Sequence, residues 1–109
     1  MIVRNKIIAH RGASMYAPEN SESSLKFASS MGVEWIETDV QITIDNQLVI
    51  FHDEKLGRTS NGEGFLALKK FSELKKLDIG SWFSKEFAGE KILSLVEFLD
   101  LIKKYKFSL

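Results

Sequence analysis

The strongest constraint on the fold is a short apolar run that stops at a glycine and precedes a helix pattern. Lys6-Ile7-Ile8-Ala9 comes shortly before Gly12. A short apolar run of this kind favours a strand buried on both faces, as in a parallel sheet. We therefore expect the chain to open with a strand that leads into a strand–helix–strand unit.

The stretch that follows predicts a helix from Asn20 or Ser21 to about Met31. Both starting residues are good N-caps, and Gly32 is placed to end the helix in a left-handed conformation. Four apolar side chains follow helical spacing and predict one buried face: Leu25, Phe27, Ala28 and Met31.

The rest of the chain alternates between strand, loop and helix patterns. Residues 34–44 and 47–51 are predicted to be two strands that pair as a hairpin through Asp45-Asn46, because β-branched residues alternate along them. Residues 53–64 are predicted to be a loop, and 65–89 an irregular stretch with a short helix at 72–76. A helix is predicted at 95–104, behind the capping box Ser94–Glu97. Residues 106–109 are predicted to start another strand. This order predicts an α/β fold.

Composition excludes several classes of protein. The 109 residues carry 15 basic and 15 acidic side chains and no cysteine. A neutral balance argues against a nucleic-acid partner, and the lack of cysteine excludes a disulfide framework and thiolate metal sites. No apolar run is long enough for a signal peptide core or a membrane span. We expect one soluble, cytoplasmic domain.

Both histidines of the chain are placed at the ends of predicted strands. His10 follows the first strand and begins His10-Arg11-Gly12, while His52 follows the strand at 47–51 and begins His52-Asp53. The carboxyl ends of strands are where α/β folds build their sites. The alternative is that each histidine caps or packs against a strand without any chemical role.

Two carboxylates form the second candidate group. Glu37 and Asp39 are two residues apart on a predicted strand, so they would share one face with Trp35. A divalent cation such as Mg²⁺ or Ca²⁺ would offset the cost of placing two acids together. The alternative is a solvated strand face.

Three further residues complete the candidate site. Arg11 is suited to binding a phosphate through its guanidinium, although a surface ion pair is the alternative. Glu19 could add a metal ligand and Asn20 could start a helix that points at an anion, although a plain helix start explains both. Imidazoles, a guanidinium and paired carboxylates together indicate metal-assisted phosphoryl chemistry.

At these residues the chain resembles the N-terminal part of the glycerophosphodiester phosphodiesterase family. Five motifs match in order: His10-Arg11-Gly12, 17–20 (APEN), 32–40 (GVEWIETDV), 49–53 (VIFHD) and 56–60 (LGRTS). Weaker agreement continues through 78–83 and 87–90 to Leu95. The resemblance covers nearly the whole chain, with Ser21 where threonine is usual and Asn46 where the turn usually has glycine.

The resemblance implies a TIM barrel, (β/α)8, of which residues 1–109 form the N-terminal part and 57–91 a family-type insertion. It also implies metal-dependent hydrolysis of glycerophosphodiesters to glycerol 3-phosphate and an alcohol, a step of lipid metabolism. In the family the counterparts of His10 and His52 are the acid/base pair and that of Arg11 binds the substrate phosphate. Those of Glu37 and Asp39 bind one divalent cation, and those of Glu19 and Asn20 support the site loop.

The resemblance also places a third metal carboxylate and an active-site lysine on a strand beyond Leu109. A TIM barrel takes about 250 residues. We therefore expect this chain to be truncated and inactive alone. The alternatives are a half-enzyme completed by a C-terminal partner or an oligomer, a non-catalytic module that binds a phosphodiester or a protein, and a phospholipase D-type toxin. The last would be expected to carry a signal peptide and cysteines.

Overall fold

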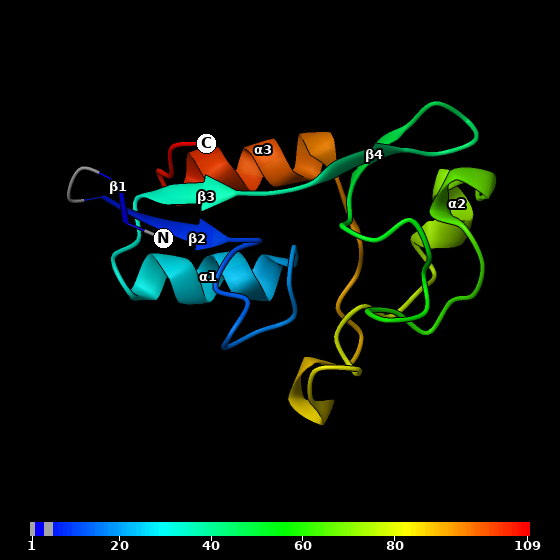
Figure 1. Ribbon diagram of the computed structural model, residues 1–109, viewed down its shortest axis with the longest axis horizontal. Helices are drawn as coiled ribbons and strands as arrows, with labels where there is room; N and C mark the ends of the chain where they lie inside the picture. Colours follow the sequence, from blue (N-terminus) through cyan, green and yellow to red (C-terminus); the bar gives the residue numbers. More distant parts are fainter. Residues whose placement is uncertain (1, 4–5) are drawn as a thin grey trace.

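The computed structural model describes residues 2–3 and 6–109, which form two small sheets flanked by helices (Figure 1). In the first sheet, β1 (Ile2–Val3) pairs antiparallel with β2 (Lys6–His10), and β2 pairs parallel with β3 (Trp35–Glu37). Ser108 bridges to Trp35 in parallel, with its amide 2.8 Å from the carbonyl oxygen of Glu34. The chain thus enters a further strand beside β3, as the sequence predicts for 106–109.

Helix α1 (Glu22–Ser30) connects the two parallel strands, and its start is fixed by serine hydroxyls. The Ser21 hydroxyl accepts from the Ser24 amide at 3.1 Å, and the Ser24 hydroxyl accepts from the Ser21 amide at 3.2 Å. This reciprocal capping satisfies two amides that have no helical partner. Gly32 adopts a φ of 75° just past the helix end, as expected.

The predicted apolar face of this helix is only half correct. Leu25 and Ala28 are buried, whereas Phe27 and Met31 are exposed. Phe27 instead contacts the ring of Tyr16, in the loop before the helix, and that of Phe87, in the distant 3-10 helix at 85–87. The strand at 6–9 differs in a similar way, because Ala9 is buried while Ile8 is only half-buried. Its predicted burial on both faces is therefore wrong at Ile8.

Residues 34–44 do not form one strand. The chain leaves the first sheet after Glu37 and enters the second at β4 (Val40–Ile42), with Thr38 and Asp39 between them. β4 pairs antiparallel with β5 (Leu48–Ile50), which confirms the hairpin, and β5 also pairs with β6 (Leu93–Ser94), a strand that the pattern did not predict. The single continuous strand was wrong because alternation alone does not show where a strand changes sheets.

Helix α3 (Leu95–Lys104) begins and ends where the sequence predicts. Ser94 and Glu97 form the expected capping box, with bonds of 3.1 and 2.9 Å. Phe98 and Ile102 of α3 pack with α1 on the Ala9–Ile36 side of the first sheet. Ile50 and Leu93 extend this core to the second sheet. Within the part of the chain that the structure describes, no helix has the length and apolar character required to cross a bilayer.

Between β5 and β6 the chain is mostly loop, interrupted by α2 (Phe71–Leu74) and the 3-10 helices η1 (Leu66–Leu68) and η2 (Lys85–Phe87). The short helix predicted at 72–76 thus lies at 71–74. Figure 1 shows α2 at the opposite end of the molecule from the two chain termini. A second apolar core supports this segment: Val49, Phe51, Leu56, Leu66, Leu74, Ile79 and Ile92.

The carboxylate of Asp78 closes the last loop of this segment. It accepts from the Ser81 hydroxyl at 2.6 Å, from the amides of Gly80 and Ser81 at 2.7 and 3.0 Å, and from the Gly89 amide at 3.1 Å. The bond from the Ser81 hydroxyl, followed by those from the three amides, holds the pKa of the Asp78 carboxyl well below its usual range. The charged form of Asp78 therefore stabilises the fold.

Replacing Asp78 by asparagine is expected to lower the free energy of unfolding by about 1 kcal/mol at pH 7, since the carboxylate is only partly shielded from water. Stability from a lowered carboxyl pKa is present above the unfolded value of about 3.9 and is lost as pH falls through the folded value. The difference between the wild type and Asp78→Asn should thus shrink below about pH 4. Urea titrations at pH 7 and pH 3 measure it, and an equal difference at both would contradict it.

Candidate active site

The end of β2 brings His10 beside the end of β3. The parallel register pairs His10 with Glu37, and the His10 Nε2 lies 3.1 Å from the Glu37 Oε2. The other carboxylate oxygen, Oε1, is buried and finds no hydrogen-bond partner among the residues that the structure describes. A buried carboxylate oxygen without a partner is costly, and a cation is one group that would satisfy it.

Arg11 turns the chain away from β2 in a left-handed conformation. Its φ is 56°, a value that costs a non-glycine residue about 1–2 kcal/mol, and Gly12 follows at 77°. Gly12 cannot be replaced without moving α1, because a Cβ there would lie 2.2 Å from the Ser24 hydroxyl. The turn is held by two backbone bonds, from the Arg11 amide to Glu37 at 2.7 Å and from the Asn20 amide to Arg11 at 2.8 Å.

This turn aims the Arg11 guanidinium at two acids without saturating it. Nη1 donates to the Glu19 Oε2 at 3.3 Å, and Nε lies 3.5 Å from the Asp39 Oδ2. Nε makes no hydrogen bond within the described residues. Both contacts are long for charge-assisted bonds, so Arg11 retains donors for an anion.

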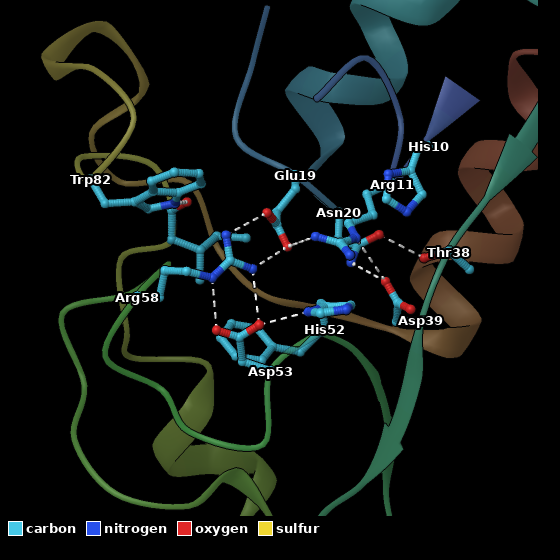
Figure 2. Close-up of polar contacts among 12 residues, drawn as sticks. His10, Arg11, Glu19, Asn20, Thr38, Asp39, His52, Asp53, Arg58 and Trp82 are labelled. Carbon is cyan, nitrogen blue, oxygen red and sulfur yellow. Dashed lines mark hydrogen bonds and ion pairs between the residues drawn. The ribbon is translucent and has the colours of Figure 1, made fainter. Parts of the chain in front are cut away.

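Asn20 fixes the break between β3 and β4. Its side chain donates to the Asp39 carboxylate at 3.2 Å and accepts from the Thr38 hydroxyl at 2.8 Å (Figure 2). Asn20 is buried and also adopts a positive φ, 55°, which asparagine tolerates better than most residues. Asp39 thus lies beyond the end of β3, held by Asn20 and Arg11. The prediction that it shares one face of a strand with Glu37 and Trp35 was wrong.

His52 reaches the site from the end of the hairpin strand β5, as the sequence predicts. The Phe51 amide donates to the Asp39 carbonyl at 3.1 Å, which brings His52 next to Asp39. The side-chain amide of Gln41 donates through its Nε2 to the backbone carbonyls of Phe51 and Asp53, at 2.8 and 2.7 Å, on either side of His52. The His52 ring itself contacts the Asp53 carboxylate, with Nδ1 and Oδ1 2.6 Å apart.

Two residues without a predicted role, Asp53 and Arg58, join this network. The Arg58 guanidinium donates to Asp53 at 2.8 and 2.9 Å and to Glu19 at 3.0 Å twice. The bonds from Arg58 hold the pKa of the Asp53 carboxyl well below its usual range, and the bonds to Asp53 and Glu19 raise the pKa of Arg58. The available signal was the place of Arg58 inside the matched motif at 56–60.

A cavity of about 730 Å³ opens beside His10 and Glu37. The residues that line it come mainly from β2 and β3: Ile8, His10, Trp35, Ile36, Glu37, Thr38 and Leu109. The volume is in the range of small-molecule sites. The polar residues that line the cavity, His10, Glu37 and Thr38, lie at the ends of the strands.

The described residues fit a divalent cation in part. Glu37 offers a buried oxygen without a partner, and Asp39 offers a second carboxylate, which is the oxygen chemistry that Mg²⁺ and Ca²⁺ prefer. Nowhere in residues 2–3 and 6–109 do three or more acidic, histidine or cysteine side chains come together as a metal site. A cation at Glu37 and Asp39 would thus need further ligands.

Parallel strands joined by a helix, with imidazole, guanidinium and carboxylate groups beyond the strand ends, are typical of the first units of an α/β barrel enzyme. The sequence model of the glycerophosphoryl diester phosphodiesterase family matches residues 10–109, so the chain belongs to this family.

Relatives and solved structures agree with this assignment. The chain is 51% identical to a putative glycerophosphodiester phosphodiesterase of Bacillus subtilis over 82% of its length, and 47% identical to a glycerophosphodiester phosphodiesterase of Caldanaerobacter subterraneus over 92%. It matches a phosphodiesterase of Oleispira antarctica, solved with the product sn-glycerol-3-phosphate, at 43% identity and a TM-score of 0.93 over 95% of this chain. An Agrobacterium tumefaciens glycerophosphodiester phosphodiesterase gives 38% and 0.89 over 92%.

The chain spans only part of each of these proteins. It covers 37% and 41% of the two curated relatives and 42% and 43% of the two solved chains. This confirms the expected fold, a portion of a (β/α)8 barrel.

Proposed function

We propose that the protein hydrolyses glycerophosphodiesters to glycerol 3-phosphate and an alcohol, with a divalent cation. The observation that carries this proposal is the meeting of groups from both sheets. His10 comes from the end of β2 in the first sheet and His52 from the hairpin, and Arg11 and Asp39 lie between these two segments (Figure 2). Family membership supports the substrate class.

In this proposal Arg11 and the two histidines each have a separate role in the reaction. Arg11 binds the phosphate, since its contacts with Glu19 and Asp39, at 3.3 and 3.5 Å, leave its guanidinium only partly paired. One imidazole takes a proton from the attacking oxygen as that oxygen bonds to phosphorus. The other gives a proton to the alcohol oxygen as its bond to phosphorus breaks. Imidazole suits both steps because it changes charge between pH 5 and 8.

Glu37 and Asp39 are the residues that would hold the cation. A bound Mg²⁺ or Ca²⁺ would neutralise charge on a phosphate oxygen. We propose that groups outside these 109 residues, from the same polypeptide or from a partner, complete the ligand set, because no three acidic, histidine or cysteine side chains come together as a metal site among the described residues. The chain alone is then expected to have little activity.

The test is release of glycerol 3-phosphate from glycerophosphocholine, with Mg²⁺ or Ca²⁺ and then with excess chelator. The protein that the cell makes from this gene should be active with a cation and lose at least 90% of its rate in chelator. Activity that persists in chelator would refute the cation, and a lack of activity with every divalent cation tested would refute the hydrolysis. Strong activity of the isolated 109 residues would show that they need no further group.

A further inference from the structure

Arg58 contacts two acids with one rigid group. Nη1 and Nη2 each lie 3.0 Å from a Glu19 oxygen, while Nε and Nη2 lie 2.8 and 2.9 Å from the two Asp53 oxygens. A planar guanidinium that makes two paired contacts of this kind sets the orientation of both carboxylates. Lysine carries the same charge but cannot make this fork.

One of these acids is shared with the phosphate-binding arginine. The Glu19 side chain is 9% exposed, and its bond from Arg11 is longer, at 3.3 Å, than either bond from Arg58. Arg58 therefore supplies most of the positive charge that Glu19 needs, which leaves Arg11 weakly held. Without Arg58, Glu19 would depend on Arg11 alone.

The other acid contacts the histidine of the hairpin. Asp53 Oδ1 lies 2.6 Å from His52 Nδ1 and also accepts from Arg58 Nη2. A carboxylate at one ring nitrogen sets the tautomer of a histidine and the direction of the ring. Because Arg58 fixes the Asp53 carboxylate, it also fixes the partner of the His52 ring.

We propose that Arg58 is a positioning residue: by holding Glu19 and Asp53 together it leaves Arg11 available for an anion and orients the ring of His52. This role rests on the proposed function, in which Arg11 binds the phosphate and His52 transfers a proton. Arg58 lies at the start of the long segment between β5 and β6, so that segment takes part in building the site.

Steady-state kinetics separates the two contacts of Arg58. Glu19→Gln removes the charge that competes for Arg11, whereas Asp53→Asn disturbs the ring of His52. Arg58→Gln should raise KM for glycerophosphocholine roughly tenfold, the factor expected for one charge-assisted bond, and should also lower kcat. In the double variant Arg58→Gln with Glu19→Gln, KM should return close to the wild-type value, while kcat should stay low. Asp53→Asn alone should lower kcat with little change in KM.

Arg58→Lys is the conservative variant and should recover stability more than kcat, because it keeps the charge and loses the fork. Lys75→Met is the matched control away from the site. Its amine lies 2.6 Å from the Glu97 carboxylate and 2.8 Å from the Ile92 carbonyl, so its replacement also removes an ion pair and a hydrogen bond, two polar contacts against the four of Arg58. If Arg58→Gln and Lys75→Met lower thermal stability by the same amount and both keep the wild-type KM and kcat, Arg58 is only structural and the proposal is wrong.

Nuclear magnetic resonance of this chain gives a readout that needs no activity. Arg58→Gln should shift the ring nitrogens of His52 while those of His10 stay in place, and it should weaken binding of inorganic phosphate followed at the Arg11 Nε. Unchanged His52 and Arg11 signals would overturn the positioning role. Shifted signals in a protein that never hydrolyses glycerophosphocholine would uphold the positioning role and refute the proposed function.

Discussion

Replacing His52 by alanine is expected to lower the rate of glycerophosphodiester hydrolysis by about 10²–10⁴-fold, the usual contribution of one general acid or base. The loss should appear in kcat, because His52 contacts Asp53 and not Arg11, the residue proposed to bind the phosphate. His10→Ala should give a loss of similar size, since the proposed mechanism assigns one of the two proton transfers to each imidazole. Initial rates with glycerophosphocholine measure both effects.

The control is Gln47→Ala, in the exposed turn of the hairpin, which should retain the wild-type rate. Both histidines are exposed, so their replacement should change thermal stability little. If either alanine variant kept more than a tenth of the wild-type kcat, that histidine would not be part of the acid/base pair.

Replacing Phe98 by alanine is expected to lower the free energy of unfolding by about 3–5 kcal/mol. The Phe98 ring is 1% exposed and lies in the core that α3 shares with both sheets. The loss combines the removed apolar contacts with the cavity that remains. Since a domain of this size has about 5–15 kcal/mol in total, the variant should be partly unfolded at 37 °C.

Val96→Ala on the same helix is the matched control, because Val96 is 69% exposed. Its effect should lie within about 0.5 kcal/mol. Urea titrations followed by circular dichroism compare the two variants. A change below 1 kcal/mol for Phe98→Ala would mean that α3 contributes little to the core.

Local signals in the sequence predicted the elements whose formation depends on neighbouring residues. Ser94 and Glu97 fix the start of α3 through their own backbone contacts, and the turn at Asp45-Asn46 lies between two alternating runs. Such features need no information from distant residues. The helix bounds 95–104 and the hairpin were therefore predicted correctly.

The parts that were missed depend on contacts between distant segments. The break at Thr38 and Asp39 exists because Asn20, about 20 residues earlier, binds both side chains. The roles of Asp53 and Arg58 depend on Glu19, which lies 39 residues from Arg58. Pattern and spacing pointed to candidate residues for the site, but not to the partners that hold them.

The two sheets are joined in two chemically different ways. On the α3 side, Ile50 and Leu93 join the first apolar core. On the side of the site, the segments carrying Arg11 and His52 are linked through Glu19, Arg58 and Asp53, largely by ion pairs that are partly open to solvent. Dissolved salt screens such pairs far more than it affects apolar contacts. Rising ionic strength should thus loosen the geometry between the two imidazoles well before it unfolds the protein.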